Sequence, residues 1–202
     1  MKKVLFFALV AAVLVGLSGT ANAAGNISLG IGGNVLLPMG DFGDVADVGF
    51  GGTVRGQYMV NDMFSVTLTS GYLLWSGKDQ TVLGVTVKGA DIKGVPVLAG
   101  AKYYFGPSGG TRFYGLGELG FMFTTVTVPS SSYTIAGITF TTPEVSASET
   151  DFSFSPGVGV ELPMGSGNSA LDIGVHFFSI GTSGTASNSI GGRVAYNFGL
   201  GN

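Results

Sequence analysis

The chain has 202 residues, of which 9 are Lys or Arg and 12 are Asp or Glu, so its formal net charge is −3. This acidic balance does not favour contact with phosphate backbones, and we expect no nucleic-acid partner. Because the sequence contains no cysteine, a disulfide framework and a thiolate metal site are both excluded.

The first residues are typical of a secretory signal peptide. The short basic start MKK precedes the apolar run VLFFALVAAVLVGL, and the small residues ANA end at Ala23. Signal peptidase recognises this arrangement, and the apolar run is somewhat short for a retained membrane anchor. We therefore expect a cleaved signal peptide over residues 1–23 and one domain over residues 24–202.

The remaining composition is unusual for a soluble domain. Only 10% of residues are charged, whereas about 25% is usual. The apolar residues alternate with small or polar ones, and after the signal no run approaches the roughly 20 residues of a membrane helix. This period of two predicts strands. In chain order we expect eight of them, over residues 26–37, 48–60, 64–75, 91–105, 112–126, 151–162, 170–180 and 189–200.

The connections between these strands alternate in length. Tight turns rich in Gly, Pro, Asn and Asp alternate with long loops, which cover residues 38–47, 76–90 and about 127–150. Short periplasmic turns and longer outer loops are typical of outer-membrane barrels. We therefore predict an all-β fold, an antiparallel up-and-down transmembrane β-barrel of about eight strands.

Charged residues in the middle of the expected strands share one face, opposite an apolar stripe. An Arg or Lys that faces lipid at the midplane costs about 2–4 kcal/mol, so these groups should point into the lumen. Three bases and three acids suggest internal ion pairs that plug the barrel. The expected lumen ion network is Arg55, Lys102, Glu118, Glu161, Asp172 and Arg193, and further polar lumen residues are Gln57, His176 and Asn197.

Counting residues from the short turns divides the ion network into two layers. Arg55, Glu118 and Arg193 lie at about one depth, and the other three charges lie nearer the periplasmic end. We expect Glu118 to stay ionised beside the two guanidinium groups and to accept charge-assisted hydrogen bonds from them.

Aromatic residues on the apolar face support a membrane location. One group lies beside the short turns and another beside the long loops, as two interfacial girdles require. A soluble lipocalin-like barrel would place its apolar residues inside. Pro96 and Pro156 count against the expected strands because each removes a ladder hydrogen bond, and β-bulges at these positions could accommodate them.

Four segments carry a resemblance to a known family: LPMGDFGD, GVPVLAGAKYYFG, FYGLGELGF and the closing GGRVAYNFGLGN. With them the chain resembles the small outer-membrane β-barrel proteins of the OmpA/OmpX-like group. The resemblance implies a location in the cell outer membrane and contact with its lipid and lipopolysaccharide. It also implies insertion by the outer-membrane assembly machinery and a monomeric state.

The function is expected to lie in the lumen and the outer loops. Eight strands close a barrel that side chains can fill, so we predict a plugged protein with a structural or interaction role. That role is envelope integrity, adhesion or partner binding, and the loop ligand is unknown. The loop at about 127–150 contains no Lys or Arg and can extend as a hairpin that offers an edge. The alternative is a narrow channel for ions or small solutes, with His176 on an ion path.

Catalysis and metal binding have weaker sequence support. A lipid-modifying outer-membrane enzyme, the remote alternative, would pair His176 with Ser179. At a spacing of three on a strand these side chains point to opposite faces, so we expect no catalytic residues and no enzyme. Asp41, Asp44 and Asp47 form a weak candidate cation site in the first outer loop, although such acids are more often simply solvated. We expect no bound metal or cofactor.

Overall fold

The chain folds into a closed antiparallel barrel. The computed structural model describes residues 27–82, 85–106, 109–135, 138–165, 169–181 and 186–200. The expected signal peptide therefore lies outside the described residues. The barrel strands are β1 (Ile27–Met39), β2 (Gly49–Asn61), β3 (Phe64–Trp75), β6 (Asp91–Phe105), β7 (Arg112–Val128), β10 (Val145–Pro163), β11 (Ser169–Gly181) and β12 (Ala186–Gly199).

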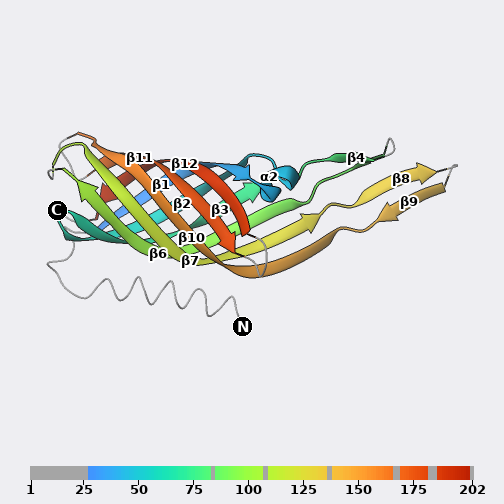
Figure 1. The fold of residues 1–202 in the computed structure, drawn as a ribbon, viewed down its shortest axis with the longest axis horizontal. Coiled ribbons are helices and arrows are strands. Elements are labelled where there is room, and N and C mark those ends of the chain that lie inside the picture. Colours follow the sequence, from blue (N-terminus) through green and yellow to red (C-terminus); the bar gives the residue numbers. More distant parts are fainter. Residues whose placement is uncertain are drawn as a thin grey trace.

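The topology confirms the predicted up-and-down barrel. Each barrel strand pairs with the barrel strands before and after it in the chain, and β1 pairs with β12 to close the ring. Figure 1 shows the strands running obliquely across the barrel, with the C-terminus at one end and two hairpins projecting from the other. In the described part of the chain, no helix is long and apolar enough to cross a membrane.

Short turns close the end where the C-terminus lies. Gly106 follows β6 and Gly165 follows β10, with φ values of 106° and 69° that favour glycine. Between β2 and β3, the Asn61 side-chain oxygen accepts a hydrogen bond from the Met63 N–H at 2.9 Å. These local features keep the connections tight, and short connections are typical of the periplasmic end.

The opposite end carries two hairpins that extend beyond the barrel (Figure 1). β7 and β10 remain paired as far as Val128 and Val145, and the hairpin of β8 (Ser131–Ile135) and β9 (Ile138–Thr142) follows. A smaller hairpin consists of β4 (Gln80–Val82) and β5 (Val85–Val87). The sequence predicted the start of β10 near residue 151, which was too late, because the strand begins at Val145 in a ribbon that extends beyond the barrel wall, where it pairs with β7.

The described strands accommodate Pro96 and Pro156 without β-bulges. Pairing continues without a register shift between β6 and β7 through Pro96, and between β7 and β10 through Pro156. On the other side of each proline the ladder is interrupted, between β3 and β6 and between β10 and β11, and it resumes in the same register. Each missing N–H is thus accommodated by a local gap in one ladder.

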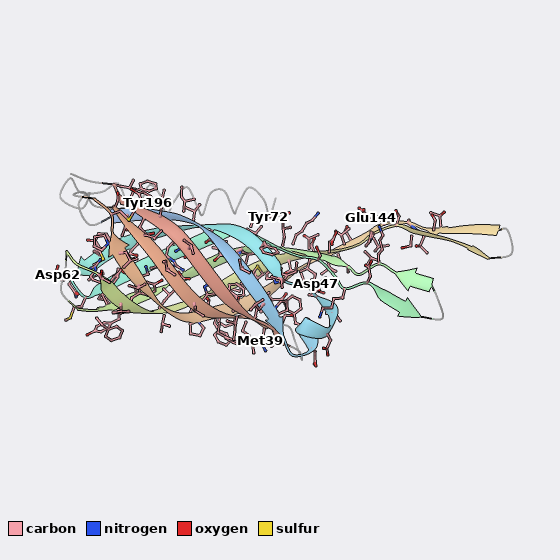
Figure 2. All side chains as sticks on the ribbon, turned by 90° about the horizontal axis from the view of Figure 1, so that it is seen from above. Met39, Asp47, Asp62, Tyr72, Glu144 and Tyr196 are labelled. Atoms are coloured by element: carbon pink, nitrogen blue, oxygen red, sulfur yellow. The ribbon has the colours of Figure 1, made fainter. Side chains whose placement is uncertain are left out.

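Apolar side chains cover the outer face of the barrel. Exposed aromatic residues lie near the short turns, for example Phe113 at 64% exposure, and near the long loops, for example Phe50 at 58%. Figure 2 shows Tyr196 toward the short-turn end, which Asp62 marks, and Tyr72 toward the hairpin end. This distribution matches the two aromatic girdles expected for a membrane barrel.

A short helix, α2 (Asp41–Val45), covers the outer mouth of the barrel. Its Phe42 is buried and packs edge-on against Trp75, with ring centroids 5.8 Å apart. The Lys78 N–H donates to the Val45 carbonyl at 2.9 Å and so ties the first outer loop to the second. The sequence predicted only a polar loop here, because five residues are too few for a helical pattern.

The barrel interior has two zones. Beneath α2 lies an apolar cluster of inward-facing strand residues with Phe42 and Ala46 from the first loop. Toward the short turns the interior becomes polar and charged. The strand members of the apolar cluster are Leu36, Leu73, Trp75, Leu98, Met122, Phe178 and Ile180.

Candidate functional site

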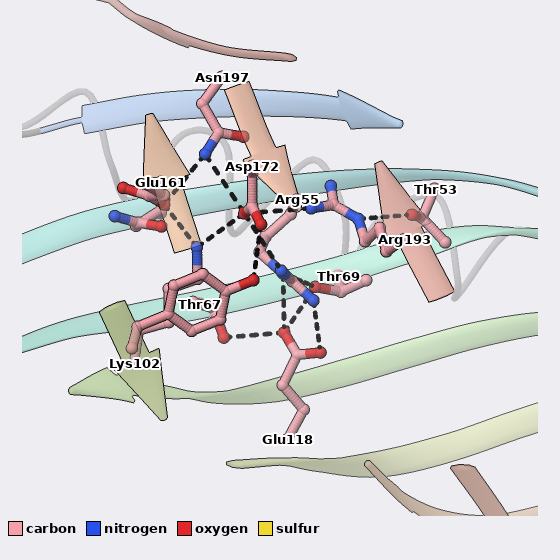
Figure 3. A network of polar contacts seen from close by, with 12 residues as sticks. Thr53, Arg55, Thr67, Thr69, Lys102, Glu118, Glu161, Asp172, Arg193 and Asn197 are labelled. Carbon is pink, nitrogen blue, oxygen red and sulfur yellow. Dashed lines mark hydrogen bonds and ion pairs between the residues drawn. The ribbon is translucent and has the colours of Figure 1, made fainter. Parts of the chain in front are cut away.

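The structure places every predicted lumen ion residue inside the barrel. They come from six different strands and converge because each occupies the inward-facing alternation of its strand. Figure 3 shows their side chains meeting across the lumen. The exposed fractions are Arg55 4%, Lys102 0%, Glu118 4%, Glu161 5%, Asp172 0% and Arg193 3%.

Asp172 is the centre of this lumen network. Its carboxylate accepts hydrogen bonds from Lys102 Nζ at 2.8 Å and from Tyr114 Oη at 2.6 Å. Arg193 Nη1 donates to it at 3.3 Å, and Arg55 Nη1 lies 3.9 Å away. One fully buried carboxylate is therefore shared by three cations, which joins the two expected layers into one network.

Glu118 forms a second centre. Arg55 donates to both of its carboxylate oxygens, at 3.2 and 3.0 Å, in a bidentate pair. The hydroxyls of Thr67 and Thr69 donate to Oε1 at 2.9 and 2.6 Å. The expectation that Glu118 also contacts Arg193 was wrong, because strand tilt brings Arg193 to Asp172 instead.

Glu161 forms the third centre, closest to the short turns. It accepts from Lys102 Nζ at 2.6 Å, from Tyr104 Oη at 3.0 Å and from Asn197 Nδ2 at 3.1 Å. Arg112 Nη2 lies 3.4 Å from the second carboxylate oxygen. With four donors around it, this buried carboxylate is well compensated for the water it has lost.

Two tyrosines surround the buried ammonium group of Lys102. The Nζ atom lies 3.9 Å from the centroid of the Tyr114 ring and 5.6 Å from that of Tyr104. The Arg112 guanidinium lies over the Tyr104 ring, with its Cζ atom 4.0 Å from the ring centroid. Cation–π contacts thus add to the ion pairs where water is excluded.

The remaining predicted polar residues occupy separate positions. Gln57 donates to Tyr104 Oη at 2.6 Å, and Asn197 lies beside Glu161. His176 is inside the barrel, where its ring packs against Phe178 at 6.3 Å and fills the space left by Gly191. Among its described contacts there is no hydrogen bond to the ion network.

The sequence interpretation missed several donors of the network, including Tyr114, which donates to Asp172. Tyr104 and Arg112 lie on inward-facing positions of β6 and β7, which strand alternation alone could have revealed. Thr67 and Thr69, which donate to Glu118, also lie on inward-facing positions of their strand. The apolar cluster under α2 was missed for another reason, since we expected apolar residues only on the lipid-facing side.

The candidate cation and enzyme sites do not assemble. Asp41 and Asp44 lie on α2 and Asp47 follows it, but no group of three or more His, Cys, Asp or Glu among the described residues could hold a metal ion. The β10–β11 register pairs His176 with Gly157 and Ser179 with Phe154, on opposite faces of the wall. These two residues are therefore not placed to share a proton.

The lumen opens at the short-turn end and narrows above it. A cavity of about 260 Å³ at that end is lined by Gln57, Arg112, Glu161 and Asn197, among others. Deeper in the barrel, two cavities beside Arg193 measure about 20 and 10 Å³. Cavities of this size have room for at most about one water molecule each.

Comparison with known proteins identifies the class of barrel. Residues 8–199 match the family described as the outer membrane protein beta-barrel domain. The chain belongs to this family. It is therefore an outer-membrane protein, as its charged lumen and aromatic girdles indicate. A search of curated proteins gave no match.

Solved structures share the fold at low sequence identity. Neisserial surface protein A is 16% identical with a TM-score of 0.52, over 85% of this chain and 94% of that one. Ail, the attachment invasion locus protein of Yersinia pestis, is 17% identical with a TM-score of 0.51, over 86% and 99%. OprG from Pseudomonas aeruginosa is 15% identical with a TM-score of 0.54, over 87% and 96%. These similarities establish the fold.

Proposed function

We propose that this outer-membrane barrel is an interaction protein that presents its outer ribbon to a partner. The free edge of β10 carries this proposal. β10 pairs with β7 from Val145 onward but with β11 only from Phe152, so residues 145–151 have one edge without a partner strand in the described part of the chain. Such an edge is a template for an added strand of another protein.

The ribbon is regular and accessible. Cross-strand hydroxyl pairs lie 3.0 Å apart at Thr125–Ser148 and Thr127–Ser146, and every residue from 145 to 150 is exposed. The edge contains no Pro or Lys, which many proteins use to block edge pairing. Its acidic residues, Glu149 and Asp151, favour a partner segment with basic side chains. Ail is named for attachment, which is the kind of role that we propose here.

The filled interior supports a sealed barrel over the channel alternative. The apolar cluster beneath α2 closes the outer mouth, and the ion pairs of Arg55, Lys102 and Arg193 occupy the lumen below it. A conducting path would have to break buried ion pairs, each at a cost of about 3–5 kcal/mol. In this proposal the chain has no enzymatic role. It is a monomer surrounded by lipid and lipopolysaccharide, and the assembly machinery inserts it.

Cell adhesion tests the proposal. Cells that display the chain are compared, on protein-coated surfaces, with cells that display a variant in which an Asn-Gly turn replaces residues 124–149. This change removes most of the free edge and joins Phe123 to Thr150, which pair across β7 and β10. We expect adhesion with the full chain and its loss with the shortened one. The matched control replaces residues 79–88 of the smaller hairpin in the same way and should adhere normally. Equal adhesion by cells with and without the chain would contradict the proposal.

A further inference from the structure

The lipid-facing wall contains a groove of about 600 Å³ with a floor of small residues. Ala101, Gly115 and Gly117 lie in this floor. A β-carbon added to Gly117 would meet no atom within 4 Å, and one added to Gly115 would meet only the Phe105 ring at 3.9 Å. The groove therefore exists because side chains are missing from the floor, and it faces lipid.

The strand register gives the groove its direction. One row of paired residues crosses the wall through Phe64, Tyr103, Gly115, Val158 and Val175. A neighbouring row lies two residues away and runs from β6 to β12, with the ladder gap at Pro156 between β10 and β11. Its groove-lining members are Ala101, Gly117, Pro156, Phe177 and Ile190.

These rows run at right angles to tilted strands, so the groove is also tilted to the membrane normal. It starts at Phe64 and Tyr103, beside the short turns, where each residue lies at or near the end of its strand. It rises to Val175, in the middle of β11. The groove thus connects the periplasmic interface with the interior of the bilayer.

We propose that this groove binds one acyl chain of a glycerophospholipid whose headgroup lies at the periplasmic interface. The groove is continuous with the lipid-facing surface of an outer-membrane barrel, and most of its lining is apolar. A flexible chain of methylene groups fits a narrow floor of glycine and alanine. The volume of the groove lies in the range of small-molecule pockets, about 300–1,000 Å³.

Tyr103 provides a polar contact at the mouth of the groove. Its ring belongs to the short-turn girdle and is 45% exposed. Among the described residues, its hydroxyl has only a weak contact with the Met63 sulfur, at 3.9 Å, so it can donate to a headgroup or ester oxygen. Because the groove opens toward the periplasmic leaflet, a phospholipid fits it better than lipopolysaccharide, whose headgroup lies at the opposite interface.

Native mass spectrometry tests the proposal. The refolded protein is reconstituted with equal amounts of palmitoyl-oleoyl phosphatidylethanolamine and lipopolysaccharide, and retained lipid is measured after transfer to detergent. We expect one phosphatidylethanolamine per barrel. Gly117→Leu fills the floor and displaces two or more methylenes, each worth roughly fourfold in affinity, so retention should fall by at least about fifteenfold. Tyr103→Phe should lower it about fivefold through the lost hydrogen bond.

Gly33→Leu is the matched control. Gly33 is a glycine of β1 with no atom within 4 Å of an added β-carbon, and it does not line the groove. Gel mobility of unheated samples verifies that each variant folds. Equal retention by the Gly117 and Gly33 variants would overturn the proposal, as would preferential retention of lipopolysaccharide. If the protein formed dimers that Gly117→Leu abolished, the groove would be an interface between copies and not a lipid site. If no lipid were retained at all, the proposal would also be wrong.

Discussion

Lys102 of β6 and Asp172 of β11 meet inside the barrel, with Nζ 2.8 Å from Oδ2 and neither side chain exposed. The two residues are 70 positions apart in the sequence. A charge buried without its partner is far more costly than the pair is favourable. The contact therefore depends on the register of every strand between them, and it penalises any slip that would separate the two groups.

Asp172→Asn should destabilise the barrel strongly. The change removes the charge that Lys102 and Arg193 share, and we expect a loss of about 3–5 kcal/mol in the free energy of unfolding. Urea unfolding in lipid bilayers measures this loss. Glu149→Gln, on the exposed outer ribbon, is the control and should change stability by less than about 0.5 kcal/mol. Equal effects of the two substitutions would argue against a dry network.

A double-mutant cycle tests the partner of Glu118. Glu118→Ala should destabilise the barrel because it leaves the Arg55 guanidinium unpaired. Adding Arg55→Met should recover part of that loss, with a coupling of at least about 1 kcal/mol. Adding Arg193→Met should give nearly additive losses, since Arg193 pairs with Asp172. Urea midpoints in bilayers measure both cycles, and coupling of Glu118 to Arg193 alone would contradict this assignment.

The refolded barrel should show no stable conductance in planar bilayers. Phe42→Ala, which removes the aromatic group from the outer lid, should remain closed as well. The reason is that the ion pairs below the lid still fill the lumen. Reproducible conductance steps from the unmodified protein would favour the channel alternative. Conductance steps from Phe42→Ala alone would show that the lid, and not the ion pairs, closes the lumen.

The mature chain should refold in detergent as a β-rich monomer with heat-dependent gel mobility. The large exposed aromatic residues on its outer face motivate this expectation, since they require an apolar solvent. Circular dichroism and electrophoresis of heated and unheated samples measure it. A chain that stays soluble and monomeric without detergent would contradict the lipid-facing assignment of that surface.

Gly100 and Gly117 should respond differently to the same small substitution. A β-carbon on Gly100 would collide with the Gly117 carbonyl oxygen and approach Glu118, whereas one on Gly117 would meet open space. We expect Gly100→Ala to cost about 1–3 kcal/mol through overpacking and Gly117→Ala to cost less than about 0.5 kcal/mol. Urea unfolding compares them, and equal losses would show that strand propensity, and not interior space, determines the effect.

The strands and their inward charges could be predicted from the sequence because both follow from alternation. Glu118 requires the polar lumen and its neighbour Leu119 the lipid, and only one register places both correctly. The partners of each charge could not be predicted, because strand tilt brings Arg193 to Asp172 and away from Glu118. The apolar cluster beneath α2 could not be predicted from the sequence either. Leu98 is apolar yet faces inward, and its environment depends on Phe42 from a distant loop.

The two proline gaps divide the barrel wall into unequal sectors. One gap lies between β3 and β6 and the other between β10 and β11, so β6, β7 and β10 form a three-stranded panel with one local ladder gap on either side. The same panel continues outward into the long ribbon (Figure 1). We therefore expect a load applied at the ribbon tip to pass down this panel, and the wall to separate first at the two ladder gaps.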